Sequence, residues 1–172
     1  MTTSSLEHLQ TLGHVIVIDD DASVRRSLCT MLERAGYEVS LYDCADAFLA
    51  NPVVPKPSVI LLDMQMPDMT GVELQEQLVK LGRKTPIVFV SGQSHPHQIV
   101  QGLKKGAVDF LFKPFNLEEL LKAIADAIEF DRRQLKQVSV DIETKREYES
   151  LTPREREVCT WLVEGQIGRA HV

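Results

Sequence analysis

The sequence has no long hydrophobic run and few cysteines, and each shortage excludes a class of protein. Its longest apolar stretches, such as "SVILLD" and "PIVFVSG", are far too short to cross a bilayer. The three cysteines (Cys29, Cys44 and Cys159) form no C-x-x-C pair of the kind that binds zinc or exchanges disulfides. The opening "MTTSSLEHLQTLGH" shows no secretory-signal pattern. We therefore expect free thiols in a cytoplasmic protein.

An excess of positive charge is also missing. The formal net charge is −6, and residues 1–129 hold 17 acidic and 11 basic side chains, whereas the rest of the chain holds eight of each. An acidic body argues against binding of nucleic acid through phosphate contacts in that part. The neutral remainder neither supports nor excludes DNA binding.

Short apolar runs do alternate regularly with amphipathic segments. The runs are rich in Val, Ile and Phe and suit strands buried on both faces. They occupy residues 15–19, 37–42, 58–63, 86–91 and 107–112. Helical patterns separate them; Thr70 and Glu73, for example, have the spacing of a capping box. Five strand-then-helix units predict an α/β fold, a five-stranded, doubly wound parallel sheet with helices on both faces.

The same patterns predict how the chain is divided. We expect a disordered N-terminal tail (1–13), an α/β domain (14–129), a helical linker (130–150) and the start of a second domain (151–165). The linker is charged and lacks Gly and Pro, which favours helix over a flexible coil. In "LTPREREVCTWLVEG", Thr152 as N-cap, Pro153 and Glu155 predict the beginning of a new helix.

Polar residues end the strands where such a sheet binds its ligands. Asp19 and Asp20 end the first strand, Asp63 the third and Ser91 the fourth, and Lys113 follows the fifth. The carboxyl ends of parallel strands share one edge, which is the usual ligand-binding edge of this fold. Three carboxylates that converge there repel one another unless a hard divalent cation joins them, and Mg²⁺ suits oxygen ligands of this kind.

A carboxylate beside bound Mg²⁺ can attack a phosphoryl group and carry it as an aspartyl phosphate. Lys113 and the hydroxyl of Ser91 would then hold the phosphoryl oxygens. Simpler interpretations exist for each residue. We prefer Asp21 as the N-cap of the first helix, and Ser91 and Lys113 could each be an ordinary strand exit. Turn chemistry does not explain why all of these polar residues should lie at one edge of the sheet.

Four motifs, "VIDDDASVRRSL", "LLDMQMPDMTGVEL", "VFVSGQ" and "GAVDFLFKPF", make residues 14 to about 128 resemble a response-regulator receiver domain of the CheY-like, flavodoxin-like fold, with strand order 2-1-3-4-5. The resemblance implies Asp63 as the phosphoacceptor. It also implies Asp20 as a direct Mg²⁺ ligand, Asp19 as a mostly water-mediated one and the backbone carbonyl of Gln65 as another.

The resemblance further implies a switch. Ser91 and Lys113 take the phosphoryl-sensing positions, and Phe110 takes the position of a rotating aromatic side chain that is often Tyr in this family. The face formed by the fourth helix, the fifth strand and the fifth helix then changes its preference for partners. Val100 and Lys104 are the interface candidates on that face, with an ordinary solvated helix surface as the alternative for Lys104.

The C-terminal "LTPREREVCTWLVEG" resembles the first helix of the LuxR-type helix-turn-helix domain, so the whole chain is similar to the FixJ/NarL group of transcriptional regulators. About 50 residues that would include the recognition helix have no counterpart here. We therefore expect DNA binding only in a full-length parent. The ending "IGRAHV" equals one translated frame of a common sequencing adapter, so we expect residues 166–172 to be adapter read-through; a natural short terminus is the alternative.

The leading interpretation is a non-enzymatic two-component response regulator. A sensor histidine kinase, or a small acyl phosphate, would phosphorylate it in the presence of Mg²⁺. The sequence leaves open whether phosphorylation drives homodimerisation. One alternative is a Mg²⁺-dependent phosphohydrolase, because Asp19 and Asp21 form an Asp-x-Asp pair. Another is a stand-alone receiver that signals through protein contacts, against which the "LTPREREV" helix counts.

Overall fold

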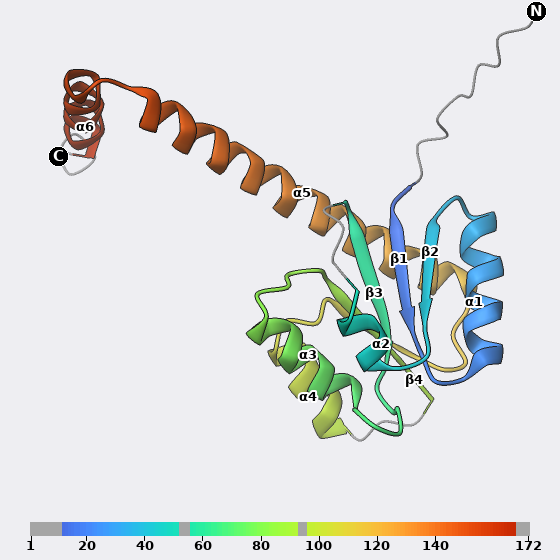
Figure 1. The fold of residues 1–172 in the computed structure, drawn as a ribbon. Helices are drawn as coiled ribbons and strands as arrows, with labels where there is room; N and C mark the ends of the chain where they lie inside the picture. The colour runs from blue at the N-terminus through green and yellow to red at the C-terminus, as the bar shows by residue number, and fades with distance from the viewer. Residues whose placement is uncertain (1–11, 52–55, 93–95, 168–172) are drawn as a thin grey trace, which may run out of the picture. The chain divides into compact units, whose positions relative to one another are not determined.

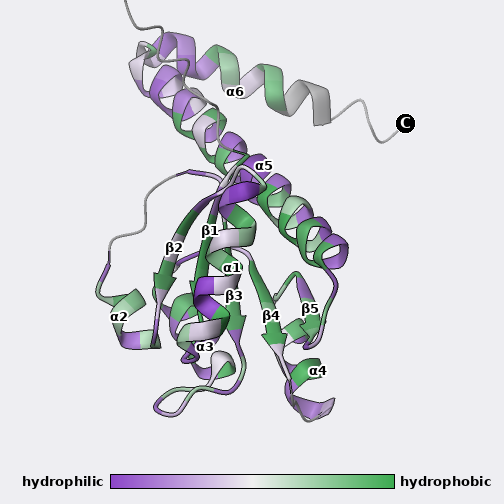
Figure 2. Ribbon diagram, turned by 90° about the vertical axis from the view of Figure 1, so that its right-hand side faces the viewer, coloured by the Kyte–Doolittle hydropathy of each residue, from purple (hydrophilic) through white to green (hydrophobic). Residues whose placement is uncertain are grey.

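The computed structural model of the protein describes residues 12–51, 56–92 and 96–167. Five strands form one parallel sheet in the order β2-β1-β3-β4-β5 (Figure 1; β5 is labelled in Figure 2). They are β1 (His14–Ile18), β2 (Glu38–Tyr42), β3 (Ser58–Asp63), β4 (Ile87–Ser91) and β5 (Asp109–Phe112). The predicted fold class and strand order are thus confirmed.

Helices cover both faces of the sheet. They are α1 (Ala22–Arg34), α2 (Ala45–Leu49), α3 (Gly71–Lys80), α4 (Pro96–Lys104), α5 (Leu117–Ser150) and α6 (Pro153–Ile167). Side chains of α1 and of the first part of α5 join one hydrophobic cluster, whereas those of α2 and α3 join the other. Among the described helices, none is both long and apolar enough to cross a membrane.

The three inner strands are buried along their length, as predicted, and they are mostly green in the hydropathy colouring of Figure 2. Alternate residues divide between the faces: Val15 and Val17 of β1 pack on the α1 and α5 side, and Ile16 and Ile18 on the other. For β2 and β5 the prediction of burial on both faces is wrong. Each has a strand on one side only, and all of its residues stay partly or fully exposed.

The helix-start signals in the sequence are confirmed. Asp21 is the N-cap of α1, and its carboxylate accepts hydrogen bonds from the amides of Ser23 and Val24. Thr70 and Glu73 form the predicted capping box of α3, with donors satisfied in both directions. These caps fix where the two helices begin, and therefore where the loops that follow β1 and β3 end.

The chain divides into two compact units, Met1–Arg133 and Gln134–Val172, and α5 runs through that boundary. In the second unit, α6 begins after Thr152, whose hydroxyl donates to the Glu155 carboxylate and accepts from its amide. Most of the predicted disordered tail (1–13) and most of the predicted adapter segment (166–172) lie outside the described residues.

Candidate functional site

Three carboxylates converge at the carboxyl edge of the sheet. Asp19 and Asp20 follow β1, and Asp63 ends β3, which pairs directly with β1. One carboxylate oxygen from each lies within 4.8 Å of the others. Asp19 is buried, at 3% exposure, whereas Asp63 is half-buried and Asp20 is exposed. The predicted convergence of these acids is therefore present, with one of them open to solvent.

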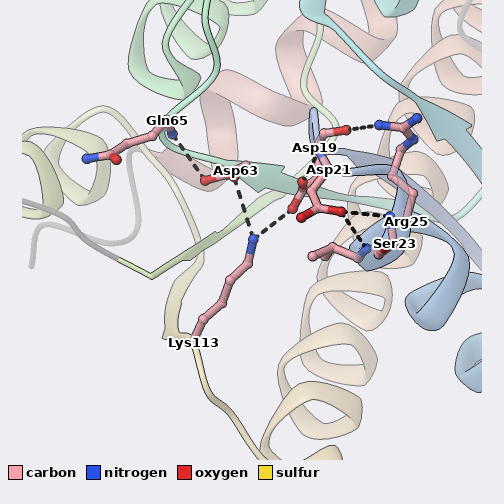
Figure 3. Close-up of polar contacts among 8 residues, drawn as sticks. Asp19, Asp21, Ser23, Arg25, Asp63, Gln65 and Lys113 are labelled. Atoms are coloured by element: carbon pink, nitrogen blue, oxygen red, sulfur yellow. Dashed lines mark hydrogen bonds and ion pairs between the residues drawn. The ribbon is translucent and has the colours of Figure 1, made fainter.

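Lys113 reaches into this group from the end of β5 (Figure 3). Its Nζ lies 2.8 Å from Oδ2 of Asp19 and 3.5 Å from Oδ2 of Asp63. Figure 3 shows the ammonium group between the two carboxylates. In this state Lys113 is thus bonded more closely to Asp19 than to the acid that the sequence predicts as phosphoacceptor.

The charges of the site do not balance. Burial raises the pKa of Asp63, and the charge of Asp19 adds to the rise, although the Gln65 amide and Lys113 oppose it. Burial alone would lower the pKa of Lys113, but its hydrogen bond to Asp19 and the charges of both acids raise it overall. Among the residues that the structure describes, three carboxylates thus lie together with one ammonium group, which pairs with two of them, and a divalent cation is the ligand that would offset the surplus.

Backbone and side-chain donors hold the carboxylates in place. The amide of Asp21 donates to Oδ1 of Asp19 at 2.8 Å, and the Gln65 amide donates to Oδ1 of Asp63 at 3.1 Å. Arg25 was missed by the sequence reasoning: its Nη1 donates to the backbone carbonyl of Asp19 at 2.6 Å. Its position in the first turn of α1, four residues after the N-cap Asp21, is the signal that could have suggested this contact.

The other predicted residues lie near the site or on the face beside it. Ser91 ends β4 and is buried, and its backbone carbonyl accepts a hydrogen bond from the Lys113 amide at 2.9 Å. The ring of Phe110, on β5, is partly buried, 6.4 Å from the ring of Phe89 between centroids. Val100, at 50% exposure, and Lys104 lie on the outer surface of α4.

Comparisons with known proteins agree with this arrangement. Residues 15–125 match the family model of the response regulator receiver domain. The response regulator protein TodT of Pseudomonas putida is 35% identical over 167 residues, which cover 96% of this chain and 74% of that protein. The transcriptional regulatory protein FixJ of Bradyrhizobium diazoefficiens is 36% identical over 157 residues, 91% of this chain and 77% of FixJ.

Solved structures show the same likeness. The response regulator StyR aligns with a TM-score of 0.81 and 37% identity, covering 88% of this chain and 77% of StyR. The structure named FixJ-N aligns with a TM-score of 0.63 and 38% identity, covering 67% of this chain and 93% of that one. The acid-edged sheet, the matched family model and these relatives lead to one conclusion: the chain belongs to the response regulator receiver family.

Proposed function

We propose that the chain is a cytoplasmic two-component response regulator in which Asp63 accepts a phosphoryl group from a histidine kinase in a Mg²⁺-dependent reaction. The observation that carries the proposal is the meeting of Asp63 with Asp19 and Asp20 within 4.8 Å, with Lys113 bonded to two of the three. Relatives named as response regulators and transcriptional regulators support it.

The donor set fits Mg²⁺. All three acids offer hard oxygen ligands, and the exposed Asp20 leaves a side of the site open to the metal's remaining waters. Asp19, Asp20, Asp63 and the backbone carbonyl of Gln65 would hold the ion. When bound, it would supply positive charge for the oxygens of an incoming phosphoryl group.

In the proposed transfer, an oxygen of Asp63 attacks the phosphorus of the donor. A carboxylate oxygen–phosphorus bond forms, the bond from phosphorus to the kinase histidine nitrogen breaks, and its electron pair leaves with that nitrogen. Lys113, already held by Asp19, would pair with a phosphoryl oxygen of the product.

The output would follow from Ser91 and Phe110. We propose that the Ser91 hydroxyl bonds the phosphoryl group and that Phe110 turns inward, which changes the surface around Val100 and Lys104. In a longer parent protein, the receiver (14–129) would act through the linker (130–150) on a helix-turn-helix domain that begins at 151–165. DNA binding belongs to that parent, and a homodimer formed on phosphorylation is one way to couple the two parts.

The test is intact mass after incubation with Mg²⁺ and acetyl phosphate. We expect a gain of about 80 Da, labile to hydroxylamine as an acyl phosphate must be, that EDTA prevents. Asp63→Ala should abolish the gain. Asp126→Ala, which removes an exposed acid on α5, is the matched control and should keep it. A gain that survives in Asp63→Ala would contradict the proposed acceptor.

The phosphohydrolase alternative finds no supporting contact among the described residues. Its Asp-x-Asp pair needs Asp21 to face the substrate, but the carboxylate of Asp21 accepts from the amides of Ser23 and Val24 as the cap of α1. Steady hydrolysis of phosphate esters, lost in Asp19→Asn and kept in Asp63→Ala, would support this alternative. A stand-alone receiver would signal through protein contacts of the receiver itself, and its output would not require residues beyond α5.

A further inference from the structure

A glutamine is buried between two helices on one face of the sheet. Gln75, on α3, is 2% exposed. Its Nε2 donates to the backbone carbonyl of Gly102, on α4, at 3.0 Å. Within the described part of the chain, its Oε1 has no hydrogen-bond partner. Burial of a side-chain amide whose oxygen has no hydrogen-bond partner is unfavourable. We therefore ask what the hydrogen bond from Nε2 to Gly102 contributes.

Gly102 is the point at which α4 meets the rest of the domain. It is the buried residue of that helix. A Cβ at this position would lie 2.7 Å from Cε2 of Phe89, so only glycine allows the helix to rest directly on that ring. The carbonyl of Gly102 also accepts the amide of Ala107 at 3.1 Å, as part of the turn that ends α4. Gln75 therefore bonds to the last turn of α4.

A second contact fastens the same end. Lys105, just beyond α4, forms an ion pair with Glu76, the residue after Gln75. Gly106 follows with a φ of +97°, which completes the turn and directs the chain into β5. Two neighbouring residues of α3, one buried and one partly exposed, thus hold the C-terminal end of α4.

This anchored end is connected to the proposed switch. Phe89 and Ser91 are two residues apart on β4, so their side chains leave the strand on the same face. Phe89 pairs in register with Phe110 on β5. The ring on which Gly102 rests therefore shares a strand face with the residue proposed to sense the phosphoryl group.

We propose that Gln75 is a positioning residue that fixes the C-terminal turn of α4 to α3 in both states of the switch, so that phosphorylation moves only the preceding part of the helix. The anchor acts through Gly102 and touches neither donor nor phosphoryl group. It gives the helix a pivot at Gly102, and residues 96–101 swing about it. The movement part of this inference rests on the proposed function.

The experiment is hydrogen exchange of the amides that close the turn, those of Lys105, Gly106 and Ala107. Gln75→Met keeps the length of the side chain but removes the donor. In the unphosphorylated chain we expect these amides to exchange about five- to tenfold faster, the effect of losing one hydrogen bond. Gln77→Met, the same change at an exposed position of α3, should leave them unaffected. Equal acceleration in both variants, or none in Gln75→Met, would overturn the anchor.

Phosphorylation supplies the readout that a merely structural role would not move. With Mg²⁺ and acetyl phosphate, exchange in the wild-type chain should change at the amides of residues 97–101 and stay constant at the three turn amides. In Gln75→Met the turn amides should change as well. Loss of their protection in the phosphorylated wild type would refute the pivot. If mass shows no phosphoryl group on any form, the proposed function fails, while the unphosphorylated comparison still decides whether Gln75 anchors α4.

Should Gln75→Met not fold, Glu76→Gln tests the same end of α4 from its solvent side. Removal of the partly exposed ion pair with Lys105 should raise exchange of the turn amides less than about twofold. A larger rise would assign the anchoring role to the ion pair instead of Gln75.

Discussion

Buried acids lie at two opposite edges of the sheet: the carboxyl edge, where the strands end, and the edge where the strands begin. The partners of these acids differ between the two edges. At the carboxyl edge, Asp19 and Asp63 share one ammonium group, that of Lys113, and Asp20 adds a third carboxylate. At the opposite edge, Asp131 on α5 is 7% exposed and accepts the amide of Ser58, the first residue of β3, at 2.8 Å. Burial raises the pKa of Asp131 as it raises that of Asp63.

The difference separates the proposed Mg²⁺ site from a structural contact. Within the part of the chain that the structure describes, Asp131 accepts from one donor, the Ser58 amide, which would otherwise be a buried, unpaired N–H at the start of a strand. Among the described residues, the acids at the other edge outnumber their cation, which leaves negative charge for a ligand to neutralise. A buried acid alone therefore does not mark a functional site; a surplus of like charge that the fold itself maintains does.

Of the substitutions that test this difference, we expect Lys113→Met to change stability most. It keeps the aliphatic stem of the side chain and removes its charge. Loss of one partner from a buried ion pair costs about 3–5 kcal/mol; because Lys113 is 24% exposed, we expect the free energy of unfolding to fall by about 2–4 kcal/mol. Urea unfolding in EDTA measures this. Lys104→Met, at an exposed position on α4, should change stability by less than about 0.5 kcal/mol.

A second substitution sharpens that result. Asp63→Asn in the Lys113→Met background removes one of the two acids that face the missing ammonium, so part of the lost stability should return. Strict additivity of the two changes would mean that Lys113 acts through Asp19 alone.

At the opposite edge, Asp131→Ala should lower the free energy of unfolding by about 1–3 kcal/mol, because the buried amide of Ser58 loses its acceptor. Urea unfolding should show this loss of stability. The rate of Mg²⁺-dependent phosphorylation by acetyl phosphate, which takes place at the carboxyl edge, should stay the same per folded molecule. A phosphorylation rate that falls more than the folded fraction would show that the two edges are coupled.

Addition of Mg²⁺ should act on one edge only. At a free concentration of ten times its Kd, the ion would stabilise the native state by about 1.4 kcal/mol. Thermal unfolding should show this gain in the wild type and in Asp131→Asn, and EDTA should reverse it. Asp19→Asn and Asp63→Asn should each reduce it, since each removes one of the clustered oxygen ligands. An undiminished gain in both variants would place the ion elsewhere.

The contrast also explains what the sequence could predict. Local sequence patterns predicted the strands, the helix caps and the acidic edge of the sheet. These patterns are the Val- and Ile-rich runs, Asp21 before α1, Thr70 with Glu73, and the carboxylates at strand ends. Parallel topology then brings the strand ends together without further information. The burial of β2 and β5 depends on which strands lack a neighbour on one side, and their composition alone does not reveal this.

The sequence patterns also did not reveal contacts between residues that are remote in sequence. Asp131 sits in "FDRRQL", which has the composition of a charged linker, yet it meets Ser58 from 73 positions away. Gln75 has the character of a polar helix residue and is buried by the close approach of α4, which depends on Gly102. Lys113 could be placed at the edge, but its preference for Asp19 over Asp63 depends on where the folded backbone directs its stem.

The smallest expected effect is the pH dependence of the Asp131 contact, measured as the difference in free energy of unfolding between the wild type and Asp131→Asn. Burial raises the pKa of Asp131, and the Ser58 amide opposes this only in part. The folded state therefore binds this proton more tightly than the unfolded chain does. The resulting stability is complete below the ordinary pKa of an aspartate and is lost as the pH rises through the raised value.

The Asp131→Asn variant would carry no titrating proton at this position but would keep an oxygen for the Ser58 amide. The wild type should therefore lose stability relative to the variant as the pH rises from about 3.5 to 7, by less than about 1 kcal/mol in total. Urea unfolding across this range measures the difference, and the titration of Asp63, common to both proteins, cancels. A wild type that gains on the variant with rising pH would mean that the Ser58 hydrogen bond outweighs burial. The acid at this edge would then be stabilised in its charged form by a backbone amide, without a cationic partner such as the Lys113 that pairs with Asp19 at the other edge.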